Sequence, residues 1–137
     1  MINIPVYFVW LAEAHGQGGQ VDEGFHLLAE ALAMVDTTRS RLAAELHRLH
    51  GELLLRQAIP DTPQAEACFQ QALEVARHQQ ARSWELRTAM SLSRLWQQQG
   101  KGAEARELLA PVYDWFTEGF DTPDLQDARA LLEELRA

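Results

Sequence analysis

The sequence has 137 residues, of which 47% are hydrophobic, which is enough for a single domain with a buried core. Twenty Asp and Glu residues against twelve Lys and Arg residues give a formal net charge of -8, which disfavours binding to duplex nucleic acid. The single cysteine, Cys68, excludes an internal disulfide, and we find neither a membrane span nor a signal peptide, so we expect a cytoplasmic protein.

Residues with high helix propensity recur at helical spacing along the chain, and strand patterns are nearly absent. Glycine, proline and short polar segments divide the chain into seven predicted helices, at about 4–16, 21–36, 39–58, 63–79, 82–99, 103–118 and 123–136. The boundary near residue 80 is the least marked, because residues 78–81 contain no strong helix breaker. Short connections between helices of this length predict antiparallel hairpins.

Three prolines inside or beside these helices have specific consequences. The tripeptide Asp-Thr-Pro occurs at 61–63 and again at 121–123. In both copies we expect threonine to cap a helix whose first residue is the proline, where the missing N–H costs nothing. Pro111 lies inside a predicted helix and predicts a kink near 107–111 or a helix that restarts there, because it cannot donate to the Glu107 carbonyl.

A repeat is visible in the second helix of each predicted hairpin, at intervals of 41 and 40 residues. A small residue is followed four positions later by a large apolar one, and a further apolar residue comes three positions after that. The three copies are Gly24, Leu28 and Ala31, then Ala65, Phe69 and Ala72, then Ala105, Leu109 and Val112. A small residue lets two helices cross closely, and the large side chain fills the adjoining space. One hairpin cannot cover its own apolar face, so we predict that the hairpins stack into a solenoid.

These positions resemble the tetratricopeptide repeat, whose second helix has a small residue four positions before a phenylalanine, as Ala65 and Phe69 are placed. In the first helix, the small position corresponds to Ala12, Gly51 and Ser93, and the tyrosine position to His15, Leu54 and Trp96. The resemblance implies an all-α, right-handed superhelix of three antiparallel helix hairpins in a single domain over residues 1–137. The repeats would cover about 4–36, 39–79 and 82–118, and the helix at about 123–136 would be a C-terminal cap.

Three segments, at 44–55, 65–77 and 109–122, also resemble the C-terminal repeat region of large bacterial signalling proteins. Those proteins join a kinase or nucleotide cyclase domain to a predicted ATPase. The resemblance implies a protein-binding or regulatory role in signal transduction and carries over no catalytic residue. The sequence contains no Walker-type phosphate loop.

Arginines on the first helices predict where a partner binds. The predicted groove residues are Arg48, Glu52, Arg56, Arg87, Arg94 and Gln98. The arginines lie at positions that usually face the concave groove of such a solenoid, and arginine suits carboxylates. We therefore predict a basic strip for an acidic peptide or for another domain of a parent protein. The alternative is a solvated face with pairs such as Glu52 with Arg56.

The sequence accordingly predicts a non-enzymatic protein-interaction module with no catalytic residue, cofactor or metal site. One alternative is a homodimer formed through an apolar patch on the N-terminal helix, namely Val6, Phe8, Val9, Trp10 and Leu11. Another is a small helical metal- or ligand-binding protein that uses His47 and His50 with Glu45.

Other residues that could carry chemistry are expected to serve the fold. Cys68 lies among apolar residues and is expected to be buried and unreactive. The glycine-rich segment 16–19 follows a helix and is expected to be a helix C-cap, not a phosphate loop. The tryptophans, Trp10, Trp84, Trp96 and Trp115, fall within helical apolar patterns and are expected to pack between helices, while the sequence leaves open whether one of them is exposed.

Overall fold

A computed structural model describes residues 21–34 and 43–136 of the chain, and this part is built from helices alone. The helices are α2 (Val21–Met34), α3 (Ala43–Leu55), α4 (Thr62–His78), α5 (Arg82–Gln98), α6 (Gly102–Asp114) and α7 (Pro123–Arg136). The predicted all-α class is confirmed for these residues. The predicted helix at 4–16, with its apolar patch, lies outside the described residues.

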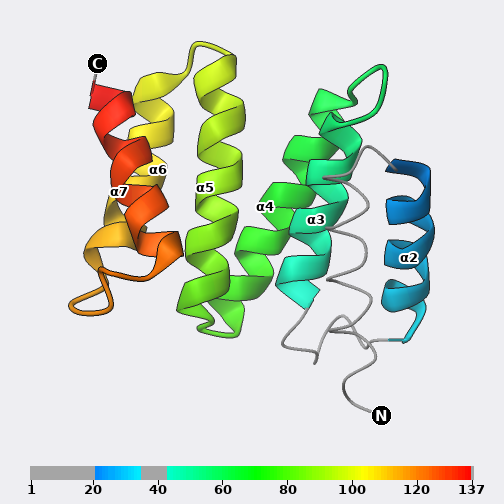
Figure 1. The fold of residues 1–137 in the computed structure, drawn as a ribbon, viewed down its shortest axis with the longest axis horizontal. Helices are drawn as coiled ribbons and strands as arrows, with labels where there is room; N and C mark the ends of the chain where they lie inside the picture. Colours follow the sequence, from blue (N-terminus) through cyan, green and yellow to red (C-terminus); the bar gives the residue numbers. More distant parts are fainter. Residues whose placement is uncertain (1–20, 35–42, 137) are drawn as a thin grey trace.

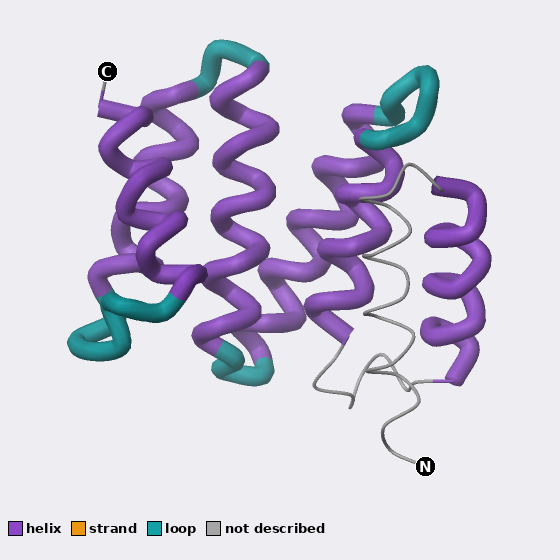
Figure 2. Tube along the Cα trace, in the orientation of Figure 1, coloured by secondary structure: helices purple, strands orange, loops and turns teal. Residues whose placement is uncertain are grey.

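From α3 onward, consecutive helices run in opposite directions and are joined by short loops (Figures 1 and 2). α3, α5 and α7 ascend in Figure 1, while α4 and α6 descend between them. α5 contacts both α3 and α7, so these three helices form one row. α4 packs against α3 and α5, and α6 packs against α5 and α7, so the descending helices cover one side of that row.

Two helices end earlier than the sequence pattern predicts. α3 ends at Leu55 instead of near residue 58, because Pro60 disfavours helical backbone at Ile59 and the Asp61 N–H turns back to the Leu54 carbonyl, at 3.2 Å. α6 ends at Asp114 instead of near residue 118, since residues 115–117 have weak helix propensity.

α6 is a single helix from Gly102 to Asp114 with Pro111 inside it, so the helix does not restart there. Pro111 is exposed.

The predicted threonine caps are wrong. α4 begins one residue early, at Thr62, which puts Asp61 at the N-cap, where its Oδ1 accepts from the Gln64 N–H at 3.2 Å. Thr122 precedes the first residue of α7, but its hydroxyl donates to the Gly119 carbonyl at 2.7 Å instead of accepting from the helix.

The turn between α4 and α5 has the hydrogen bonds of a Schellman motif, with Gln80 in the left-handed conformation at φ 55°. The Gln80 N–H donates to the Arg77 carbonyl at 3.1 Å, and the Ala81 N–H donates to the Ala76 carbonyl at 2.8 Å. α5 ends in the same way, with Gly100 at φ 79°. The helix boundary near residue 80, where the sequence has no strong helix breaker, is therefore formed by a glutamine in the left-handed conformation that glycine usually adopts.

Replacing Gln80 with glycine is expected to raise the free energy of unfolding by about 0.5–1 kcal/mol, because glycine adopts this backbone conformation without a steric penalty. Urea denaturation followed by circular dichroism measures the change. Gly100 provides the matched control, since a Cβ added there meets no described atom within 4 Å. Gly100→Ala should cost about 1 kcal/mol from backbone conformation alone. A Gln80→Gly variant no more stable than the parent contradicts this explanation.

The positions of the repeat are buried wherever their side chains are described. Gly24, Ala65 and Ala105 are all buried, as are the large residues that follow them: Leu28, Phe69 and Leu109. Ala72 and Val112 are buried as well, and Ala31 falls outside the residues whose packing is described.

The small positions of the first helices contact the second helices directly. A Cβ added to Gly51 of α3 would lie 2.6 Å from Cε1 of Phe69 on α4, so the phenyl ring occupies the space that glycine leaves. One repeat later, Ser93 of α5 donates from its hydroxyl to the Ala105 carbonyl of α6, at 3.2 Å. Each close crossing thus joins the two helices of one hairpin.

Two apolar clusters hold the hairpins together. The cluster around Phe69 joins α3, α4 and α5; its buried members are Leu54, Ala65, Cys68, Phe69, Leu92 and Leu95. The larger cluster joins α5, α6 and α7 with Leu73 of α4, and it includes Leu86, Met90, Leu109, Leu125 and Leu131. α5 contributes to both clusters, so the hairpin of α3 and α4 and the last helix, α7, both pack onto α5.

Candidate partner-binding groove

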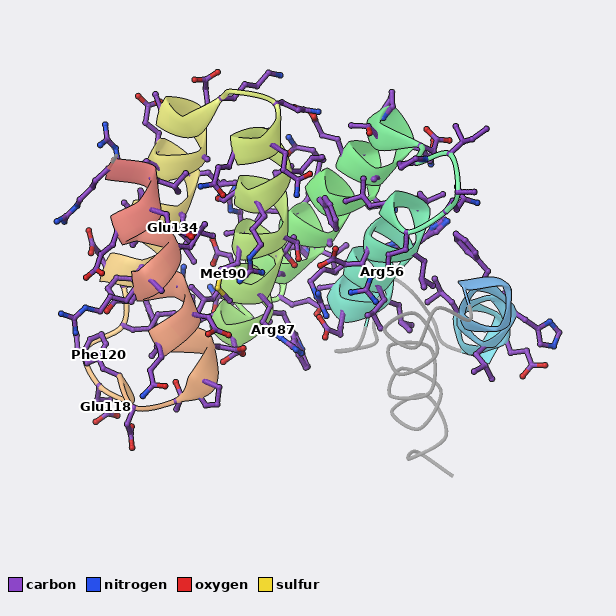
Figure 3. The ribbon with its side chains drawn as sticks, turned by 45° about the horizontal axis from the view of Figure 1, so that its top comes forward. Arg56, Arg87, Met90, Glu118, Phe120 and Glu134 are labelled. Atoms are coloured by element: carbon purple, nitrogen blue, oxygen red, sulfur yellow. The ribbon has the colours of Figure 1, made fainter. Side chains whose placement is uncertain are left out.

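A groove of about 290 Å³ lies along the row formed by α3, α5 and α7. Its lining residues are Arg48, Leu49, Glu52, Leu53 and Arg56 from α3 and the loop after it, Arg87, Met90, Ser91 and Arg94 from α5, and Asp124 and Asp127 from α7. Figure 3 shows Arg56 beside α3, with Arg87 and Met90 along α5. Five of the six predicted groove residues therefore line one cavity. The sixth, Gln98, is exposed and is not part of the lining.

The groove has an ion-pair network at its base, centred on Glu45. Arg48 holds both carboxylate oxygens of Glu45, with its Nε 2.7 Å from Oε1 and its Nη2 2.9 Å from Oε2. Nη1 of Arg87, on α5, lies 2.6 Å from the same Oε2. The carboxylate is buried with Arg48, so each charge is compensated where water cannot reach it.

The network continues across the groove in both directions. Arg87 Nε lies 3.6 Å from the Asp124 carboxylate on α7. Arg48 Nη1 lies 3.4 Å from Oε2 of Glu52, and the Ser91 hydroxyl donates to that same oxygen at 3.1 Å. Side chains of α3, α5 and α7 are thereby bonded to one another at the base of the groove.

The groove is consequently less basic than the sequence predicts, because the protein's own carboxylates hold Arg48 and Arg87. Arg56 and Arg94 are exposed, and neither forms an ion pair with another described residue. The alternative pairing expected from the sequence, Glu52 with Arg56, does not form, since Glu52 is engaged by Arg48 and Ser91. The arginines available to a partner are therefore Arg56 and Arg94.

The apolar residues of the lining contribute little surface. Leu49, Leu53 and Met90 are each at most 3% exposed, because they also pack into the core. A partner in the groove meets mainly guanidinium, carboxylate and hydroxyl groups. The groove therefore offers charges and hydrogen-bonding groups rather than an apolar anchor.

The two histidines singled out in the sequence lie on a different face from this groove. The His50 Nδ1 atom is 3.5 Å from Cys68 Sγ, and the His50 ring makes an edge contact with Phe25 at 6.0 Å between centroids. Burial lowers the pKa of His50 and raises the pKa of the Cys68 thiol, so both groups favour their neutral forms. Burial, followed by the neighbouring charge of His50, also lowers the pKa of His47. A reactive thiolate–imidazolium pair is disfavoured by these shifts.

Glu45, the third member of the alternative metal site, is bonded to two arginines instead. Across residues 21–34 and 43–136, no three His, Cys, Asp or Glu side chains are grouped so that they could hold a metal ion.

Stability is expected to decrease as the pH falls from about 7.5 to about 5.5, because the partly buried His47 and His50 have a lower pKa in the folded chain than in the unfolded chain, near 6.5. The unfolded chain therefore takes up protons first, and the stabilisation present above this range is lost below it. Melting temperatures at the two pH values measure the effect. The double variant His47→Gln/His50→Gln should show a smaller decrease, whereas replacement of the exposed His26 should leave it intact. If the double variant and the His26 variant lose equal stability between the two pH values, His47 and His50 are not the cause of the pH dependence.

The tryptophans with described positions differ in exposure. Trp84 and Trp96 are partly buried, while Trp115 is 53% exposed and stacks under the Arg82 guanidinium, at 4.8 Å from its ring centroid. Trp115 is therefore the exposed tryptophan that the sequence leaves open, and Trp10 lies outside the described residues.

Sequence reasoning missed Ser91, Asp124 and Asp127 as groove residues, and it assigned Glu45 to a metal site instead of to the ion pairs beneath the groove. The spacing of Glu45 and Arg48 is a signal for an ion pair within one helix. The contacts to α5 and α7 have no such local signal, because they join residues about 40 positions apart in the chain.

Comparisons with known proteins add no family to this description: no family model matches the chain, and no significant match was found among curated proteins or solved structures. None of the helices in the described part is long and apolar enough to cross a membrane.

Proposed function

We propose that the chain is a tetratricopeptide-like repeat module, without enzymatic activity, that binds an anionic segment of a protein partner in the groove along α3, α5 and α7. The arrangement of small and large residues at Gly51 with Phe69, and at Ser93 with Ala105, supports the repeat assignment. The position of the groove on the row of first helices supports its role as the binding surface.

The observation that carries this proposal is the difference between the arginines of the groove. Arg48 and Arg87 are neutralised in a network that also orders their neighbours, whereas Arg56 and Arg94 extend from the same surface without an ion pair among the described residues. A guanidinium group on an ordered surface is well suited to bind a carboxylate with two parallel hydrogen bonds. Binding has to order mainly the two exposed arginine side chains, which limits the cost of association.

The cellular setting of this activity is also a proposal. The segments at 44–55, 65–77 and 109–122 support a regulatory repeat region of a cytoplasmic bacterial signalling ATPase or cyclase. In that setting the partner is either a separate protein or another domain of the same parent. Homodimerisation through the N-terminal helix concerns residues outside the described part, so no described contact favours it.

A peptide selection tests the proposed groove. The immobilised chain is used to select binders from a phage-displayed library of random peptides, and enriched peptides are synthesised and their affinities measured. We expect peptides rich in Asp and Glu, with affinity reduced about tenfold or more by Arg56→Glu/Arg94→Glu, because two attractive contacts become repulsive.

Arg106→Glu is the matched control, since Arg106 is exposed on α6 and lines none of the grooves described here. This change should leave the affinity within about twofold. Selected peptides that bind the double groove variant as well as the parent chain would overturn the proposal.

A further inference from the structure

We infer that the groove recognises a segment of mixed charge, in which an acidic group and a basic group lie about three to four residues apart. This inference rests on the proposed function and specifies the partner's chemistry. It follows from a third unpaired charge in the lining. Asp127, on α7, is exposed and forms no ion pair with the residues that the structure describes.

The free charges are arranged with opposite signs on two sides of the groove. Arg56 follows α3 and Arg94 is on α5, while Asp127 is on α7, which packs on the other side of α5 from α3. Figure 1 shows the three helices ascending together, so positions along them can be compared. In the network, Arg48 and Arg87 face the carboxylates of Glu45, Glu52 and Asp124, which gives one net negative charge. Outside the network there are two positive charges near α3 and α5 and one negative charge near α7.

The contact between Arg87 and Asp124 sets the relative height of α5 and α7. Arg94 is seven residues beyond Arg87, or about 10 Å along the helix axis, and Asp127 is three residues beyond Asp124, or about 4.5 Å. Their heights therefore differ by about 6 Å, and the helix axes are separated by about 8–10 Å, which places the two positions about 10–12 Å apart. An extended peptide covers this distance in three to four residues.

A wholly acidic segment fits this arrangement less well than a mixed one. Its carboxylates near Arg56 and Arg94 would be accepted, but a carboxylate near Asp127 meets a like charge. A lysine at that position gains an attraction in place of this repulsion. Because the groove has little apolar surface, these charge contacts determine which segments it prefers.

Two synthetic peptides test the inference: acetyl-Glu-Glu-Ser-Ser-Ser-Lys-amide, which has mixed charge, and acetyl-Glu-Glu-Ser-Ser-Ser-Glu-amide, which is wholly acidic. Their dissociation constants for the full chain are measured by NMR titration. We expect the mixed peptide to bind about 3- to 10-fold more tightly, the effect of exchanging one exposed repulsion for one attraction.

The variant Asp127→Arg should reverse the preference, so that the wholly acidic peptide binds more tightly than the mixed one. Glu107→Arg makes the same change of charge on the exposed face of α6, which lies outside the groove, and should leave the preference as in the parent chain.

The outcomes separate this inference from the proposed function. If both peptides bind equally, or if Asp127→Arg leaves their ratio unchanged, while Arg94→Glu weakens both, the inference is wrong and the groove remains a binding site for anionic segments. If neither peptide binds the parent chain, or if Arg94→Glu has no effect on either, the inference and the proposed function both fail.

Discussion

Replacing Phe69 with alanine is expected to lower the free energy of unfolding by about 3–5 kcal/mol, the range found for truncating a fully buried aromatic residue. The phenyl ring has no exposed surface and lies in the apolar cluster that joins α3, α4 and α5. Its loss removes the contact with Gly51 and leaves a cavity between the two helices of the hairpin. Urea denaturation followed by the helical circular dichroism signal measures the change.

Phe120 provides the control, because this phenylalanine is 46% exposed on the loop before α7. Phe120→Ala should cost less than about 1.5 kcal/mol, since a half-exposed side chain loses less contact and leaves no cavity. Similar losses at the two positions would contradict the central role given to Phe69.

The Gly51–Phe69 contact should also appear as coupling between the two sites. Gly51→Ala places a methyl group where the ring now lies, within 3.0 Å of three of its carbon atoms, and the ring must shift. In Phe69→Leu that space is partly vacated, so Gly51→Ala should be less destabilising there than in the parent chain, by about 1 kcal/mol. Additive effects would show that the two positions do not restrict each other.

Replacing Glu45 with alanine is expected to lower the free energy of unfolding by about 3–5 kcal/mol, because it leaves the buried guanidinium of Arg48 without its closest counter-charge. Glu45 accepts three of the short hydrogen bonds at the base of the groove, two from Arg48 and one from Arg87. Thermal and urea denaturation of the single variant measure the loss.

Two further variants distinguish the charge from the volume of the side chain. Glu45→Leu/Arg48→Met removes both charges and keeps the space filled, so it should recover most of the stability lost in Glu45→Ala. Glu133→Ala disrupts the exposed pair of Arg129 and Glu133, at 3.5 Å, and should cost less than about 1 kcal/mol. A Glu45→Ala variant as stable as Glu133→Ala would show that the network contributes little.

The sequence predicts the helices well where local chemistry decides their ends. α4, α5 and α7 agree with the predicted ranges to within one residue at each end. Aspartate and proline mark the starts of α4 and α7, and glycine marks the end of α5, whereas no breaker marks the boundary between α4 and α5. The ends of α3 and α6 differ by three to four residues, since there the chain leaves the helix before the strong breaker is reached. Gln80 shows a second limit of prediction from sequence. The hydrogen bonds of the turn hold this residue in a left-handed conformation that glutamine disfavours.

The sequence predicts which residues line the groove better than it predicts the charge of the groove. Helical spacing places Arg48, Arg87 and Arg94 on one side of their helices, and the structure brings them together. Which arginines remain available depends on carboxylates from other helices. Glu45 reaches Arg87 across 42 positions of sequence, and Asp124 approaches it from α7. The residue spacing within one helix does not predict contacts with other helices, so these ion pairs of Arg87 can be identified only from the structure.

The exposed charges of the groove and the buried ion pairs beneath it should respond differently to ionic strength. Dissolved ions screen exposed charges beyond about 8–10 Å at physiological concentration but act weakly on pairs that water does not reach. Arg56, Arg94 and Asp127 are accessible to these ions, whereas Glu45 and Arg48 are not. Added salt is therefore expected to weaken binding of the proposed partner while the contacts of Glu45 and Arg48 between α3 and α5 persist. The shape of the proposed binding surface should then be retained when the salt is removed.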